Sequence, residues 1–295
     1  TLSNIEPTGG GIYATPTNRV FTIDTTAAAP SVPDLAADDD TGPFNNDDIT
    51  SQTTGLTFSG TAESNASIEL FDGVTSLGTA GADISGNWTI TIGLSAGVHS
   101  INAVQTDTTG NVSPASGNLS LTIDTSASAP SAPDLDADDD TGSSGSDNKT
   151  KNTSGLTFNG TSESNAAIRL YDGVTQLGAT TADGFGNWTV DLSLSAGTYT
   201  IHAVQTDLAG NVSTASGTLS VTIDTSAAAP SVPDLDEADD TGTSNSDNIT
   251  SQTSGLTFSG TAEGEAAIEI FDGSTSIGTT NADGSGGWTI ELSLT

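Results

Sequence analysis

The chain repeats itself with a fixed period of 100 residues, and this periodicity limits its possible folds more than any single motif does. The tryptophans Trp88, Trp188 and Trp288 lie in phase, and the segment SGLTFNGTSE at 154–163 returns as SGLTFSGTAE at 254–263. This period exceeds the roughly 20 to 50 residues of solenoid repeats and matches the size of a self-contained domain. We therefore expect a tandem array of domains, each with its own hydrophobic core.

The phase of the repeat also predicts the domain boundaries. We expect three units at residues 25–124, 125–224 and 225–295, while residues 1–24 lie in the phase of the last strands of a preceding or permuted unit. The third unit lacks counterparts of residues 196–224, which would be its last two strands. Because the chain has no Met and begins at Thr1, we interpret it as a processed or excised piece.

The charge of the chain restricts its partners. The sequence has 38 Asp and Glu residues against 4 Lys and Arg residues, a formal net charge of −34. Such a surface repels nucleic acids and anionic membranes and attracts cations. No apolar run approaches the ~20 residues of a membrane-spanning helix, so we expect no direct membrane insertion. The chain has no Cys, which excludes disulfide bonds.

Within a unit, apolar residues alternate with polar ones in the manner of half-buried strands. In the second unit the inward positions are Leu156, Phe158, Gly160, Ile168, Leu170, Trp188, Val190, Leu192 and Leu194. With a first strand between residues 131 and 150, the unit has about seven short strands, the pattern of an Ig-like β-sandwich. We interpret Trp188 as a core residue. Pro130 and Pro133 stiffen the linker, so we expect an all-β fold of tandem Ig-like sandwiches in an elongated rod.

An acidic run follows each linker and is the best functional signal. Asp136, Asp138 and Asp140 imitate the spacing of an EF-hand loop, but the glycine comes one place late and no helices flank the run. Crowded like charges nevertheless call for a counter-charge. Carboxylate and carbonyl oxygens without His or Cys favour Ca²⁺ over Zn²⁺ or copper, so we predict calcium as the cofactor.

The candidate calcium ligands are acidic and amide residues that recur in phase. They are Asp24, Asp34, Asp39, Asp40, Asp47, Asp107, Asn111, Asp124, Asp134, Asp139, Asp140, Asp147, Asp207, Asn211, Asp224, Asp234, Asp239, Asp240 and Asp247. In a seven-stranded sandwich the first and last strands end at opposite poles. We therefore expect Asp124 and the turn from Asp107 to Asn111 to face the acidic loop of the next unit and to share an ion with it.

The segments PSVPDL, ADDDTG, SGLTFSGTAE and AVQTDLAGNVS, followed by TIDT, resemble the bacterial Ig-like repeats of giant surface adhesins and biofilm-associated proteins. The resemblance covers nearly the whole chain after Asp24. It implies tandem Ig-like domains, export to the bacterial cell surface, calcium between or beside domains, and a role as a stalk. By position it marks residues 106–111, Asp124 and residues 134–140 as ion-binding candidates.

An enzyme, a carbohydrate- or ice-binding module and a filament are the alternatives to a stalk. The only histidines, His99 and His202, fall at unequal places in the repeat, and we expect no enzyme. A carbohydrate- or ice-binding module is disfavoured by the 5% aromatic content and by the similarity of the copies. A stalk remains, with neighbouring domains as partners. Alternatively, residues 1–24 of one chain complete the third unit of another chain by strand addition, which would give a filament.

Overall fold

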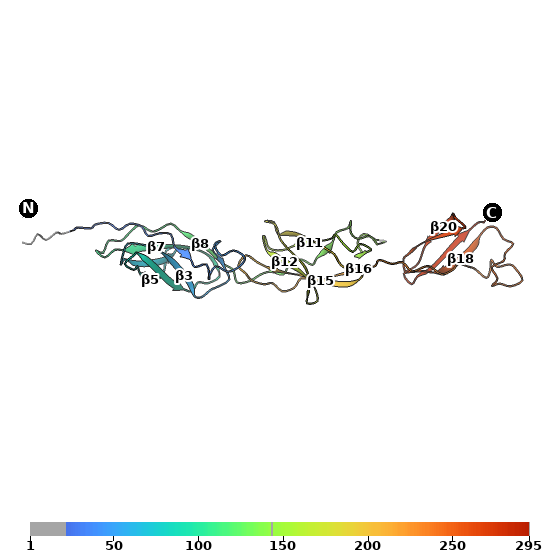
Figure 1. Cartoon of the computed structure of the whole chain (residues 1–295), viewed down its shortest axis with the longest axis horizontal. Coiled ribbons are helices and arrows are strands. Elements are labelled where there is room, and N and C mark those ends of the chain that lie inside the picture. Colours follow the sequence, from blue (N-terminus) through green and yellow to red (C-terminus); the bar gives the residue numbers. More distant parts are fainter. Residues whose placement is uncertain (1–21, 143, 295) are drawn as a thin grey trace, which may run out of the picture. The chain divides into compact units, whose positions relative to one another are not determined.

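The structure is a computed structural model that describes residues 22–142 and 144–294 (Figure 1). Every regular element in this part of the chain is a β-strand, which confirms the predicted all-β class. The described residues form two compact units. One contains most of the first repeat, and the other contains the second and third repeats together with the short segments 41–44 and 49–51.

The second repeat consists of two sheets that pack face to face. Its strands are β9 (Asp134–Leu135), β10 (Lys149–Thr150), β11 (Leu156–Thr161), β12 (Ala167–Asp172), β13 (Thr175–Thr181), β14 (Asn187–Leu192), β15 (Gly197–Thr206) and β16 (Leu219–Ile223). One sheet has the order β14-β11-β9, and the other has the order β10-β16-β15-β12-β13. The short pair β10 and β16 is parallel, whereas the other pairs are antiparallel.

The core of the second repeat lies between these sheets. Leu156 and Phe158 of β11 and Ile168 and Leu170 of β12 are buried, as their alternation with polar residues predicts. Trp188 of β14 is also buried within this core, which confirms its interpretation as a structural residue. The core therefore comes from the inner faces of both sheets.

The first repeat has the same arrangement. Its strands are β1 (Asp34–Leu35), β2 (Ile49–Thr50), β3 (Leu56–Thr61), β4 (Ser67–Asp72), β5 (Thr75–Gly81), β6 (Asn87–Ile92), β7 (Gly97–Thr106) and β8 (Leu119–Ile123). The sheets have the orders β1-β3-β6 and β2-β8-β7-β4-β5. Phe58 faces Ile90 across β3 and β6, just as Phe158 faces Val190 across β11 and β14. The 100-residue phase is thus preserved in the strand register.

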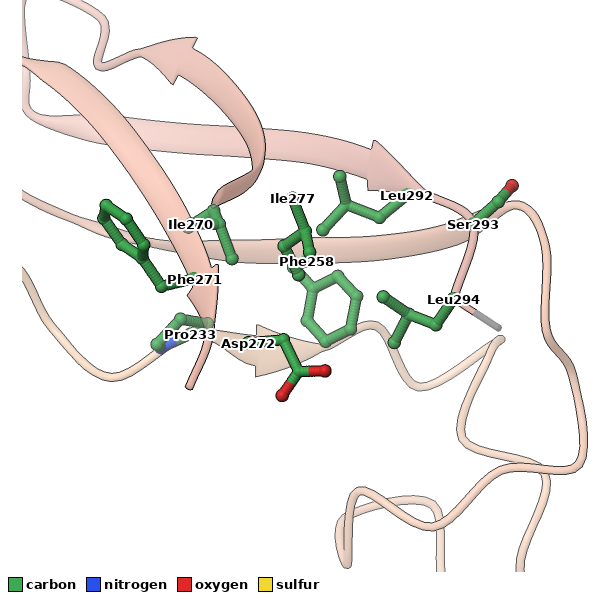
Figure 2. Close-up of a pocket in the computed structure, with 9 residues that line it drawn as sticks. All are labelled: Pro233, Phe258, Ile270, Phe271, Asp272, Ile277, Leu292, Ser293 and Leu294. Carbon is green, nitrogen blue, oxygen red and sulfur yellow. The ribbon is translucent and has the colours of Figure 1, made fainter. Parts of the chain in front are cut away.

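The third repeat has a smaller second sheet. Its strands are β17 (Asp234–Leu235), β18 (Leu256–Thr261), β19 (Ala267–Asp272), β20 (Thr275–Asn281) and β21 (Gly287–Leu292). Within the described residues, β19 pairs with β20 alone, whereas its counterparts β4 and β12 each have two partners. The consequence is a largely apolar groove of about 500 Å³. Phe258, Ile277 and Leu292 lie close together along it (Figure 2).

The segment between residues 131 and 150 differs from its prediction. We expected one strand there, but the structure has the two-residue strands β9 and β10, which belong to different sheets. Between them the backbone turns back on itself, because the N–H groups of Asp139 and Asp140 both donate to the carbonyl oxygen of Asp136. The residues from 134 to 148, with their counterparts 34–48 and 234–248, form what we call the acidic loop. It passes from one sheet to the other.

Candidate metal site in the acidic loop

Two carboxylates of the acidic loop are hydrogen-bond acceptors for the backbone. In the second repeat, Asp139 Oδ2 accepts the N–H of Thr157 at 2.8 Å, next to the first residue of β11. The buried Asp140 accepts the N–H groups of Asn148 and Lys149 at 2.9 and 3.2 Å through its two oxygens. A charged acceptor forms strong bonds to backbone N–H groups that would otherwise be unsatisfied. These bonds close the loop.

The other repeats use the same contacts. Asp39 and Asp239 accept the N–H groups of Thr57 and Thr257, both at 2.8 Å. The buried Asp40 accepts the N–H of Asp48 at 3.1 Å. In-phase recurrence, from which we predicted metal ligands, is therefore explained at these positions by the closing of the loop itself. The two roles do not exclude each other, because a carboxylate oxygen has more than one lone pair.

Asp48 is a candidate residue that the repeat pattern did not reveal, because the second and third repeats have Asn148 and Asn248 in its place. All three residues have a left-handed backbone with φ of 57°, a conformation that Asp and Asn tolerate better than most residues. Burial raises the pKa of Asp48, and the nearby carboxylates of Asp40, Asp34 and Asp47 raise it further. Three carboxylates of the first acidic loop thus repel the carboxylate of Asp48.

The third acidic loop contains a buried carboxylate oxygen that lacks a hydrogen-bond donor in the part of the chain that the structure describes. Asp240 is buried, and its Oδ2 accepts the N–H of Asn248 at 3.0 Å. Its Oδ1 is also buried, and among the described residues it has no hydrogen-bond partner. A buried carboxylate oxygen without a donor is unfavourable unless a cation or water satisfies it.

The donor chemistry of these loops fits Ca²⁺, which binds carboxylate and carbonyl oxygens. Among the described residues, their side chains do not converge as the ligands of a metal centre do. No group of three Asp, Glu or His side chains within residues 22–142 and 144–294 is arranged so as to hold a metal ion. Of the other in-phase acids, Asp34, Asp134 and Asp234 lie exposed on the first short strand of each repeat. Asp147 and Asp247 each accept the N–H group two residues further on.

The turn from Asp107 to Asn111 is closed by hydrogen bonds within the turn. Asp107 accepts the N–H groups of Thr109 and Asn111, both at 2.8 Å, and the Asn111 side-chain amide at 2.7 Å. Burial acts to raise the pKa of Asp107, but the hydrogen bonds from Asn111 and Thr109 outweigh it and lower the pKa to about 2. Asp207 accepts the equivalent bonds from Asn211 at 2.8 Å.

We expected this turn and the last residue of the repeat to lie at the same end of a unit, and the structure shows that this expectation is wrong. In the second repeat, Asp207 follows the last residue of β15, whereas Ile223 pairs with Gly197 at the beginning of β15. At about 3.3 Å per residue, the ten residues of β15 separate the two points by roughly 30 Å. Asp224 instead lies beside its own acidic loop, since its N–H donates to the carbonyl oxygen of Thr150. A unit therefore has its turn and its last residue at opposite ends.

The side chains of Asp24, Asp124 and Asp224 have a local role. Each accepts the N–H of the residue two positions later, at 3.0 to 3.2 Å, so each begins a linker with an Asx turn. This geometry accounts for their recurrence through backbone hydrogen bonding.

Two sheets packed face to face recur along the chain with the same bond from an acidic loop to the backbone, and this recurrence defines a tandem array of β-sandwich domains. The chain belongs to the bacterial Ig-like domain family, whose profile matches residues 26–125, 126–225 and 226–294. The family suggested by the sequence motifs is thus confirmed. No curated protein matched the chain.

Several solved structures resemble the chain at low identity. The fibronectin(III)-like modules of Clostridium thermocellum CbhA are 14% identical with a TM-score of 0.35, covering 65% of this chain and 94% of theirs. A 1.5-MDa bacterial ice-binding adhesin is 20% identical with a TM-score of 0.38, covering 90% and 88%. A biofilm-associated protein is 17% identical with a TM-score of 0.25, covering 67% and 30%. Because every TM-score is below 0.5, none of these structures bears on the function.

Among the described residues, no helix has the length and hydrophobicity needed to cross a membrane.

Proposed function

We propose that the chain is a structural extender, a stalk segment of a bacterial cell-surface adhesin or extracellular fibre. The observation that carries this proposal is the anchoring of both ends of each linker. After the second repeat, the N–H of Asp224 is bound to Thr150, and the N–H of Ala228 is bound to the carboxylate of Glu263. Only residues 225–227 lie between these anchors. The two anchored N–H groups are thus four residues apart and at most about 14 Å from each other, which favours closely spaced domains over a freely jointed chain.

The stalk role is tested by small-angle scattering on the full chain and on a variant that lacks residues 126–225. Because this deletion removes one period and retains one linker, we expect the maximum dimension to fall by roughly 30 to 40 Å, about the length of one sandwich. A compact protein of this size would have a radius of gyration near 19 Å. Such a value for the full chain, or a maximum dimension unchanged by the deletion, would contradict the proposal.

We further propose that Ca²⁺ binds the acidic loops and stabilises the stalk. Two observations support this: the mutual repulsion of Asp48 with Asp34, Asp40 and Asp47, and the buried Oδ1 of Asp240. An ion bound only by the folded state raises the melting temperature by mass action.

The calcium proposal is tested by calorimetric melting of the full chain in millimolar Ca²⁺ and in chelator. Asp48→Asn introduces the residue found in the other repeats, so it should raise the melting temperature in chelator and reduce the increase caused by calcium. Asp38→Asn makes the same change of charge at an exposed position of the same loop and should have a smaller effect on both values. Equal behaviour of the two variants, or coincident melts with and without calcium, would overturn the proposal.

A head-to-tail filament is a second candidate, and two observations favour it. Ile23 is 86% exposed, whereas its in-phase counterparts Ile123 and Ile223 are both 2% exposed. The third repeat has the apolar groove beside β19. A second copy of the chain is the proposed occupant, through the segment that includes Ile23. Residues 1–21 of that segment lie outside the described part of the chain.

Sedimentation velocity of the full chain and of a variant without residues 1–24 tests the filament. Concentration-dependent association that disappears with the deletion would support strand addition between copies. A full chain that stays monomeric at high concentration would rule out the filament and leave the stalk proposal intact.

A further inference from the structure

The side chain of His99 lies between two hydrogen-bond acceptors in the first repeat. It belongs to β7, and its side chain is only 10% exposed. Its Nδ1 is 2.8 Å from Oδ2 of Asp72, and its Nε2 is 2.9 Å from the carbonyl oxygen of Ser95. A carboxylate and a carbonyl can only accept at these contacts, and a neutral imidazole has a single N–H to donate. Both bonds form together only when His99 is protonated.

The charged surroundings of His99 are simple. Of the two strands that pair with β7, β8 carries no charged residue, and β4 carries Glu69 and Asp72. Glu69 is bound to the hydroxyl of Ser76. The residues 93–96 and the facing strands β3 and β6 have no charged side chains. The next carboxylates are Asp48, whose carbonyl accepts the N–H of Thr122, and Asp124, which follows β8 in sequence.

These contacts determine how the pair titrates. Burial lowers the pKa of His99, but the hydrogen bonds to Asp72 and Ser95 outweigh it, and the net pKa is raised above 6.5. The pKa of Asp72 is lowered, mainly by the bond from His99 and also by the N–H of Ser100. A raised His pKa contributes stability that is fully present below pH 6.5 and is lost as the pH rises through the raised value. A lowered Asp pKa contributes stability that is lost in acid, so the pair is most effective between about pH 4 and 6.5.

The second repeat keeps only the contact with residue 195 and has no titrating imidazole at this position. Tyr199 replaces His99, and its hydroxyl lies 3.1 Å from both the carbonyl oxygen and the hydroxyl of Ser195. Asp172, the counterpart of Asp72, still accepts the N–H of Thr200 at 3.0 Å. A phenol does not change its charge near neutral pH. The chain therefore contains its own control.

We infer that the first repeat carries a pH-dependent clamp, in which the imidazolium of His99 ties Asp72 at the end of β4 to the segment that enters β7. Above the pH at which His99 loses its proton, only one of the two bonds can persist. The first repeat then loses stability and the segment 93–99 opens more often, while the contact between Tyr199 and Ser195 in the second repeat does not change.

Proton NMR of the full chain tests the charge state, because the chain has only 2 histidines. His99 should titrate with a pKa above 6.5, and Asp72→Asn should lower that pKa, while the signal of His202 stays in place. The second signal belongs to His202, which stacks on Tyr171 at a centroid distance of 5.7 Å. A His99 pKa at or below 6.5, or one unaffected by Asp72→Asn, would overturn the inference.

Hydrogen exchange by mass spectrometry across pH 5.5 to 8.5 tests the loss of stability, with the second repeat as the reference within each sample. The protection of residues 93–99 relative to 193–199 should fall as the pH rises. His99→Tyr should remove this dependence, and Tyr199→His should create it in the second repeat. If His99→Tyr fails to fold, His99→Gln provides the same comparison. A pH dependence that persists without His99 would contradict the clamp.

Discussion

The carboxylate of Asp139 accepts the backbone N–H of Thr157, 18 residues further along the chain, at 2.8 Å. The same bond joins Asp39 to Thr57 and Asp239 to Thr257. It connects the acidic loop to the strand that carries Phe58, Phe158 or Phe258, of which the first two are fully buried. The most regular acidic residues of this chain therefore stabilise the sandwich, whether or not they also contact an ion.

Asp139→Ala should destabilise the second repeat by about 1 to 3 kcal/mol, because it leaves the N–H of Thr157 without its charged acceptor. Asp138→Ala removes a carboxylate at the adjacent exposed position and should change stability by no more than about 0.5 kcal/mol. Chemical denaturation in chelator measures both changes without any contribution from calcium. Equal stability of the two variants would argue against the structural role of Asp139.

Gly160→Ala should destabilise the second repeat by about 1 to 3 kcal/mol, because a Cβ at this position would overlap the indole ring of Trp188. Gly217→Ala is the matched control: a Cβ there would lie 3.5 Å from Ala132, an ordinary contact. Thermal melting of both variants provides the comparison. A melting temperature lowered as much by Gly217→Ala would show that packing against Trp188 is not the cause.

Phe158→Ala should cost about 3 to 5 kcal/mol, the usual loss for a fully buried Phe. Phe258→Ala should cost less, because Phe258 borders the groove of the third repeat and is only partly buried. Hydrogen exchange within each repeat reports the two effects separately. If Phe258→Ala proved equally damaging, the groove would have to be covered in solution.

The turn at Asp107 should persist in acid to a lower pH than an ordinary aspartate would allow. The lowered pKa means that the stability contributed by Asp107 is present above pH 3.8 and is lost as the pH falls toward about 2. The amide proton signals of Thr109 and Asn111, followed by NMR, should shift in that range. Asp107→Asn should remove the transition. A transition centred near pH 4 would contradict the hydrogen-bonding pattern.

The repeat period predicted the strands well, because burial on one face of a strand imposes an alternation that the sequence shows directly. Leu156, Phe158 and Trp188 were correctly placed in the core from this alternation. The first strand was less predictable. Two-residue strands such as β9 and β10 are too short to show an alternation, and their existence depends on which sheet edge lies nearby.

The candidate metal site was harder to predict from the sequence. Recurrence of Asp139 and Asp140 showed that each copy needs these carboxylates but did not show for what purpose. Asp48 was missed for the opposite reason, because it departs from the phase and its importance comes from three carboxylates that the fold brings near it.

The sequence by itself determined the number of repeats, the all-β class, the core residues and the excess of acidic residues, since all of these depend on composition and on short-range periodicity. The tertiary structure alone decided which backbone N–H each carboxylate accepts and that Asp207 and Asp224 lie at opposite ends of β15. The physical reason is that hydrogen bonds and charge repulsion depend on distances of a few ångströms between residues far apart in the chain. Those distances exist only once both sheets have formed.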